Sequence, residues 1–66
     1  MQITINGKNY SFERSTTLSG LLADLGVITN KVAVEHNLEI KPKSTFDQLI
    51  LQDGDNLEII HFIGGG

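Results

Sequence analysis

The chain has 66 residues, of which 39% are apolar and 20% are charged, with no cysteine and a net charge of −3 at pH 7. This length allows one domain at most, with a small core, because a domain of this size buries only about 60% of the surface of its unfolded chain. The acidic balance argues against a nucleic-acid partner, and the lack of cysteine excludes disulfides, thiolate metal sites and a cysteine nucleophile.

The first part of the chain predicts a β-hairpin. Residues 2–6 (QITIN) and 8–13 (KNYSFE) each alternate between apolar and polar side chains, as half-buried strands do. Asn6-Gly7 separates these two runs, and both residue types tolerate the positive φ angles of the tight turns that join paired strands. We therefore expect two antiparallel strands joined by this turn.

A helix is predicted over residues 17–25. Its apolar stripe has the spacing i, i+3, i+4 and i+7 and consists of Leu18, Leu21, Leu22 and Leu25. Thr16 or Thr17 provides a hydroxyl that caps the first turn, and Gly26 ends the helix in a left-handed conformation. Gly20 destabilises the helix by about 1 kcal/mol relative to alanine, so we expect it to allow close packing of the helix on a sheet.

The rest of the chain predicts further strands and turns. Residues 31–37 (KVAVEHN) indicate a third strand, and residues 38–40 (LEI) a short return strand. Residues 44–49 allow one helical turn with its apolar side chains pointing inward. Residues 53–55 (DGD) form a turn, and residues 56–63 (NLEIIHFI) form the last strand.

The last strand is apolar on both faces. Leu57 and Ile59 face one way, whereas Ile60 and Phe62 face the other. A strand that a helix covers on one side only should carry polar residues on its other side. Two interpretations remain open: the fold covers both faces locally, or the second face is a patch that docks a partner. On the second interpretation, Ile60, Phe62 and Ile63 make the docking contacts.

Together these elements predict an α+β fold of the β-grasp type. A mixed sheet of four or five strands would carry one main helix on one face, with the last strand in a central position beside the first. We expect residues 1–63 to form this domain and residues 64–66 to form a flexible glycine tail. The expected core consists of Ile3, Ile5, Leu21, Leu22, Leu25, Val32, Val34, Leu57 and Ile59.

No catalytic constellation is visible in the sequence. His36 and His61 are isolated, and a lone histidine in or beside a strand is more often packed or solvated than bound to a metal. Asp53 and Asp55 flank a glycine, but the later ligands of a calcium-binding loop are missing. We therefore expect no catalytic residue and no bound metal.

Three glycines, Gly64, Gly65 and Gly66, follow the last strand. A terminal glycine run is often an inert, frayed end. This run, however, starts directly at the end of the predicted central strand, and an extended glycine chain fits a channel too narrow for any side chain. A carboxylate delivered through such a channel can be adenylated by ATP, after which a sulfur or nitrogen nucleophile can displace AMP.

Four stretches carry a resemblance to a known family: TLSGLLADLG (17–26), VAVEHN (32–37), EIKP (39–42) and DGDNLEIIHFIGGG (53–66). On these stretches the chain resembles the ThiS-type sulfur carriers of thiamine (thiazole) biosynthesis, which have the ubiquitin-like β-grasp fold. The closing stretch is the most specific of the four. The resemblance implies a carrier or co-substrate protein that is not an enzyme.

The resemblance also implies a chemistry centred on the last residue. An adenylyltransferase related to ubiquitin-activating enzymes would use ATP and magnesium to adenylate the carboxyl group of Gly66, so the carrier itself would bind no cofactor. Sulfur that originates from a cysteine desulfurase would replace AMP and give a thiocarboxylate. Thiazole synthase would then receive the sulfur, and Gly64 and Gly65 would thread the tail into these partners.

Three other functions remain open. The small subunit of molybdopterin synthase uses the same tail chemistry, a ubiquitin-like modifier would be joined to lysines through Gly66, and a plain interaction domain would carry an inert tail. The chain shows no apolar signal region and no apolar run long enough to cross a membrane. We therefore expect a cytoplasmic protein that does not contact a membrane and is a monomer when free.

Overall fold

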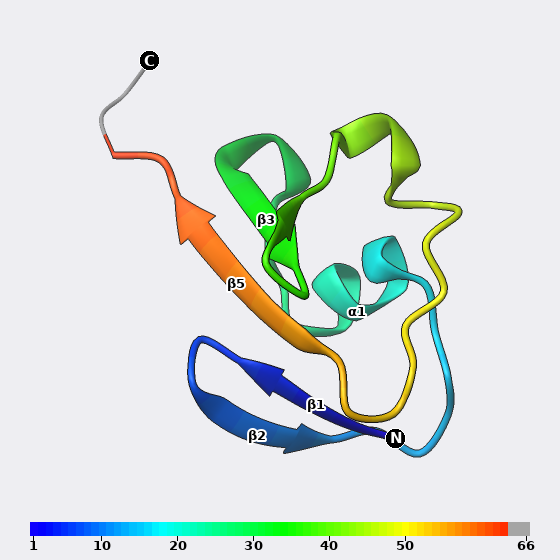
Figure 1. The fold of residues 1–66 in the computed structure, drawn as a ribbon. Coiled ribbons are helices and arrows are strands. Elements are labelled where there is room, and N and C mark those ends of the chain that lie inside the picture. The colour runs from blue at the N-terminus through cyan, green and yellow to red at the C-terminus, as the bar shows by residue number, and fades with distance from the viewer. Residues whose placement is uncertain (64–66) are drawn as a thin grey trace.

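The computed structural model describes residues 1–63, which form a mixed β-sheet with one α-helix on one of its faces (Figure 1). The elements are β1 (Gln2–Ile5), β2 (Lys8–Ser11), α1 (Leu18–Asp24), β3 (Val32–His36), β4 (Glu39–Ile40) and β5 (Asn56–His61), together with the short 3₁₀ helices η1 (Thr29–Lys31) and η2 (Lys43–Thr45). Within residues 1–63, none of the helices has both the length and the apolar character that crossing a membrane requires.

The strands lie in the order β2-β1-β5-β3-β4, so the last strand in the sequence is the central strand of the sheet (Figure 1). β5 runs parallel to β1 and antiparallel to β3, and each edge strand pairs antiparallel with its neighbour. Parallel pairing of β1 and β5 requires a crossover connection, which contains α1. The predicted α+β arrangement, with the last strand beside the first, is confirmed.

Two tight turns close the two hairpins. Asn6 and Gly7 join β1 to β2 with φ angles of 50° and 83°, as the sequence predicts. Asn37 and Leu38 join β3 to β4 with φ angles of 50° and 73°. The prediction that the return strand includes Leu38 is therefore wrong, because this leucine belongs to the turn. Left-handed leucine is uncommon, since its Cβ crowds the following carbonyl oxygen.

The helix has the predicted capping residues, but it is one residue shorter at each end than the predicted range of 17–25. Thr17 is its N-cap, and the Thr17 Oγ1 accepts a 3.1 Å hydrogen bond from the N–H of Gly20. The N–H groups of Leu18 and Ser19 donate to main-chain carbonyls of the segment before β5, so the first turn has no unsatisfied donor. At the other end, Gly26 has a φ of 72°, which is the left-handed conformation that stops a helix.

Gly20 contacts the helix cap rather than the sheet. A Cβ at this position would lie 2.2 Å from the Oγ1 of Thr16 and 3.3 Å from the Oγ1 of Thr17. The prediction that Gly20 allows the helix to pack closely on the sheet is therefore wrong. Its missing side chain makes room for the two threonines that precede α1, so the glycine is explained by the geometry of the helix start.

The core lies between α1 and the inner face of the sheet. Its buried apolar residues are Ile3, Ile5, Leu18, Leu21, Leu22, Val32, Val34, Phe46, Leu51, Leu57 and Ile59. One predicted core residue is wrong: Leu25 is 37% exposed, because α1 ends at Asp24 and this leucine is the C-cap at the rim of the helix. Phe46, which follows the short helix η2, points into the core as predicted, and Leu51 enters the core from the loop before β5.

Replacing Leu38 with glycine should stabilise the protein. A left-handed backbone costs leucine roughly 1–2 kcal/mol, and the greater freedom of glycine in the unfolded chain offsets about 0.4–1 kcal/mol of the relief. Leu38 is 84% exposed, so little packing is lost. We expect the unfolding free energy to rise by about 0.5–1 kcal/mol, measured as a rise of a few degrees in melting temperature. The control Leu38→Ala removes most of the side chain but keeps the unfavourable φ; equal gains for both variants would exclude φ as the cause.

Candidate functional site

The last described residues of the chain form the candidate site. Along β5, Leu57 and Ile59 point into the core, whereas Ile60 lies on the opposite face and is 50% exposed. Phe62 is 58% exposed, and Ile63 is fully exposed. In the part of the chain that the structure describes, the fold therefore does not cover the second face of β5. Of the two interpretations of this strand, the one with a covered second face is excluded.

Apolar and acidic side chains share the uncovered face of the sheet, called here the open face. Ala33 lies opposite Ile60 in the β3–β5 ladder, and Glu35 lies opposite Glu58. Ile40 pairs with Glu35, so it belongs to the same face, and it is exposed. Like charges directly opposite each other destabilise a sheet. This pair of glutamates therefore does not stabilise the isolated domain, and the fold alone does not explain why both residues are acidic.

Two interactions hold the chain just before it leaves the sheet. The N–H of Phe62 donates a 2.9 Å hydrogen bond to the carbonyl of Lys31, which extends the β3–β5 pairing past the end of β5. The Nζ of Lys43 lies 5.3 Å from the centroid of the Phe62 ring, within the range of a cation–π interaction. Figure 1 shows β5 running past the β1–β2 hairpin toward the C-terminus. Gly64, Gly65 and Gly66, the predicted carriers of the tail chemistry, lie outside the described residues.

The side chain of Asn6 ends the ladder between β1 and β5. Strand pairing stops at Ile5 and Leu57, and the main-chain N–H of Asn6 still donates to the Leu57 carbonyl at 2.9 Å. The Asn6 amide then bonds to both main-chain groups of Ile59: Oδ1 accepts from its N–H at 2.7 Å, and Nδ2 donates to its carbonyl at 3.2 Å. One side chain thus replaces one residue of a neighbouring strand. The sequence marks Asn6 as a turn residue only, because no linear pattern indicates a contact across the fold.

A nearly buried carboxylate fixes the start of β5. The Oδ2 of Asp55 accepts hydrogen bonds from the Nε2 of His36 and from the N–H of Gln52, both at 2.9 Å. Its Oδ1 accepts from the Nδ2 of Asn37 at 3.1 Å. These bonds connect the end of β3, the β3–β4 turn and the loop before β5. The sequence predicts the turn that contains Asp55, but it does not indicate this network.

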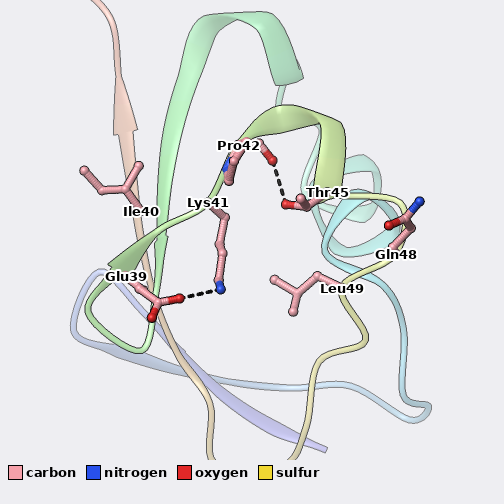
Figure 2. A pocket seen from close by; sticks show the side chains of 7 residues that line it. All are labelled: Glu39, Ile40, Lys41, Pro42, Thr45, Gln48 and Leu49. Atoms are coloured by element: carbon pink, nitrogen blue, oxygen red, sulfur yellow. Dashed lines mark hydrogen bonds and ion pairs between the residues drawn. The ribbon is translucent and has the colours of Figure 1, made fainter.

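A shallow pocket of about 350 Å³ lies beside the edge strand β4 (Figure 2). It is lined by residues 39–42 and by Thr45, Gln48 and Leu49. Glu39 and Lys41 point toward each other and form an ion pair, and the hydrogen bond and charge of Lys41 lower the pKa of Glu39 (Figure 2). The two charges of the pocket are therefore paired with each other. No histidine lines the pocket, and we assign no chemistry to it.

The remaining candidate residues stay separate within residues 1–63. No group of three or more histidine, cysteine, aspartate or glutamate side chains is arranged there to hold a metal ion. His36 is bonded to Asp55, whereas His61 lies exposed at the end of β5. The Oδ1 of Asp53 accepts a 2.7 Å hydrogen bond from the N–H of Gln2, which connects the turn before β5 to the start of β1.

Comparison with known proteins identifies one family. The profile of the ThiS family matches residues 3–66. The chain is 38% identical over 65 residues to the sulfur carrier protein ThiS of Bacillus subtilis, covering 97% of this chain and 98% of that protein. It is 54% identical over all 66 residues to a protein of Paramagnetospirillum magneticum named thiazole synthase.

A solved structure of a related protein has the same fold. The crystal structure of the thiamine biosynthesis protein ThiS from Geobacter metallireducens matches with a TM-score of 0.87 and 36% identity, over the full length of both chains. The relatives differ in extent, because this chain spans nearly all of the B. subtilis carrier but only 20% of the thiazole synthase. The close structural match confirms the predicted β-grasp fold.

The Asp55 network predicts a pH-dependent stability. Burial alone raises the pKa of Asp55, but the hydrogen bonds from His36, Asn37 and Gln52 outweigh burial and lower the pKa below its ordinary value of 3.8. The unfolded chain therefore binds more protons in acid. The contribution of ionised Asp55 to the unfolding free energy is complete above about pH 5. It is lost as the pH falls below 3.8 toward the pKa of Asp55 in the folded protein.

Replacing Asp55 with asparagine should lower the unfolding free energy at pH 7 by about 1–3 kcal/mol, because one acceptor atom becomes a donor that faces other donors. Melting temperatures of the two proteins should differ most at neutral pH and converge toward pH 3. The control Asp47→Asn changes an exposed carboxylate and should have little effect at any pH. If the difference in melting temperature between wild type and Asp55→Asn stayed constant with pH, the charge of Asp55 would not be the source of its stabilising effect.

Proposed function

This chain belongs to the ThiS family, and from this membership we propose that it is a sulfur carrier of thiamine biosynthesis whose Gly66 carboxyl group accepts the sulfur. The observation that carries the proposal is the end of β5. The central strand continues past its neighbour β1 and delivers an exposed chain at Ile63 from a base anchored to β3. The sulfur carrier of B. subtilis, which this chain matches over almost its full length, supports the same function.

The chemistry follows from the properties of a carboxylate. Its negative charge is shared by two oxygens, so it resists nucleophilic attack. Transfer of AMP from ATP to the Gly66 carboxylate, with release of pyrophosphate, gives a mixed anhydride with a good leaving group. The outer sulfur of a persulfide can then attack the carbonyl carbon and displace AMP, which gives an acyl disulfide. A thiol attacks the S–S bond of this intermediate and releases the thiocarboxylate, while the thiol becomes part of a new disulfide. The resulting thiocarboxylate is a stronger nucleophile than the carboxylate, because sulfur is larger and more polarisable.

In this scheme the protein is a co-substrate that is used and regenerated, and it is not a catalyst. Adenylation belongs to a partner adenylyltransferase that binds ATP and magnesium. The sulfur originates from a cysteine desulfurase, and thiazole synthase receives it. Support for the last partner comes from the P. magneticum protein named thiazole synthase, in which the matched segment is part of a longer chain. These steps take place in the cytoplasm.

We further propose that the open face, together with the exposed Ile63 that follows β5, docks the adenylyltransferase. Ile60, Phe62 and Ile63 present exposed apolar surface directly before the glycines, which is where an enzyme that receives the tail must make contact. Glu35 and Glu58, directly opposite each other, suit a partner that brings a basic side chain between them. The apolar contacts provide affinity, and the acidic pair favours one orientation of the partner.

Intact mass spectrometry tests the function. The purified protein is first measured alone, because the proposal requires that Gly66 carries the free carboxyl group. It is then incubated with ATP, magnesium, the adenylyltransferase, the desulfurase with cysteine, and a thiol reductant, and we expect a mass gain equal to the replacement of one oxygen by sulfur. The product should lose this sulfur on incubation with thiazole synthase and its other substrates. An unchanged mass would favour an inert tail, and transfer to a molybdopterin precursor instead would favour the small subunit of molybdopterin synthase.

The position of the carboxylate should matter more than its chemistry. Deleting Gly66 moves the carboxylate back by about 3.3–3.6 Å, and a misplacement of about 1 Å can reduce a rate on the order of 100-fold. We expect no ATP–pyrophosphate exchange with this variant, although Gly65 then ends in a similar carboxylate.

Gly65→Val should also show no ATP–pyrophosphate exchange, because its branched side chain clashes with a narrow channel. Neither variant loses a core side chain, so both should melt like the wild type; normal exchange by Gly65→Val would reject the narrow channel.

Replacing Ile60 with serine should weaken docking while the fold persists. Burial of an isoleucine against a partner contributes roughly 1.5 kcal/mol or more, so we expect about a tenfold rise in the Kd for the adenylyltransferase, with Phe62→Ser having a similar effect. The control Ile50→Ser changes an isoleucine of similar exposure on the loop that bridges to Thr17, and its Kd should match the wild type. Unfolding of Ile60→Ser, or equal effects of Ile50→Ser, would contradict the assignment of the docking surface.

A further inference from the structure

Beyond Ile59, the edge of β5 that faces β1 has no neighbouring strand within the described residues, and a partner could bind there. β1 pairs with β5 only as far as Ile5 and Leu57, and the Asn6 side chain then occupies both main-chain groups of Ile59. Beyond that point, the described part of the chain places no strand beside β5 on this side. On the other side, β3 continues to pair with β5 to its end.

The alternation of an antiparallel ladder determines where the last main-chain groups point. Hydrogen-bonded and non-bonded pairs alternate along β3 and β5. Asn56 and Phe62 bond to the β3 side, through Asn37 and Lys31, so the even-numbered residues of this stretch use that side. The N–H and C=O groups of His61 therefore point to the opposite side, where β1 has already ended. If the chain stays extended past β5, the N–H of Ile63 points to this side as well.

These groups are exposed to water in the free protein but not in a complex that encloses the tail. A buried main-chain donor or acceptor without a partner costs about 1–3 kcal/mol. The β3 side is already occupied, so hydrogen bonds to His61 and Ile63 have to come from the protein that receives the tail. Side chains on the open face, such as Ile60, remain available for docking at the same time because they project from the sheet rather than along its edge.

We propose that an extended segment of the adenylyltransferase pairs with β5 beside His61 and Ile63, continuing the sheet where the Asn6 side chain ends it. The inference rests on the proposed function, because it requires a partner that encloses the tail. Strand addition to an open edge takes its affinity from main-chain hydrogen bonds. It also fixes the register of β5 against the enzyme, and register determines how far the following residues reach into the channel.

Amide hydrogen exchange, resolved by residue, tests the pairing directly. In the free protein, the amide of Phe62 should be protected by its bond to Lys31, whereas those of His61 and Ile63 should exchange rapidly. In the complex with the adenylyltransferase, without ATP, His61 and Ile63 should become protected by at least tenfold. A complex that forms while both amides keep their free exchange rates would overturn the inference and leave the proposed function intact. Failure to form any complex would overturn both.

A matched pair of variants at Ile63 separates the main chain from the side chain. Ile63→Ala keeps the N–H, whereas Ile63→Pro removes it, and proline fits an extended chain at the end of a strand. Both should melt like the wild type, because the fully exposed Ile63 lies beyond β5. In ATP–pyrophosphate exchange, we expect kcat/KM for Ile63→Pro to be at least tenfold below that of Ile63→Ala. Equal values for the two variants would show that the Ile63 N–H makes no bond to the enzyme.

Discussion

Burial of Leu57 and Ile59 beneath α1 determines how the neighbouring strands and the helix are arranged. These residues lie on the central strand, so β1 and β3 must pair on its two sides and the helix must cross one face. Side chains alternate along a strand, so the same burial forces Ile60 and Phe62 outward. A slip of one residue would exchange the two sets and bury the wrong face. The core and the open face are therefore two results of a single register.

The sequence predicts this architecture because its strongest signals are periodic. The Asn-Gly turn, the leucine stripe and the alternating runs all repeat over short distances, and each agrees with the others. The errors occur where periodicity stops. Leu25 continues the stripe past the end of a short helix, Leu38 continues a β-type run into a turn, and Leu51 enters the core from a segment without regular structure. These positions depend on tertiary packing, which outweighs local preference.

Only part of the candidate site can be predicted from the sequence. A strand with two apolar faces already indicates the exposed patch at Ile60 and Phe62, because one covered face cannot explain it. The roles of Asn6 and Asp55 are not predictable in this way. Each uses side-chain atoms to bond a distant main-chain or side-chain group, and such contacts leave no repeat in the sequence. The sequence marks both residues as turn formers, and the structure adds which strand each one holds.

The two ends of β5 differ in how their polar groups are satisfied. At its start, Asp55 and Asn37 bond across the fold, so melting that end would expose a network that stabilises the domain. At its far end, β5 is paired on the β3 side, and within residues 1–63 no strand lies beside His61 on the other side. Bonds made there to a partner replace water rather than native contacts, so binding at this end does not compete with folding. The proposed exchange of the carrier between enzymes would use this separation, because each exchange of partner must leave the core between α1 and the sheet undisturbed.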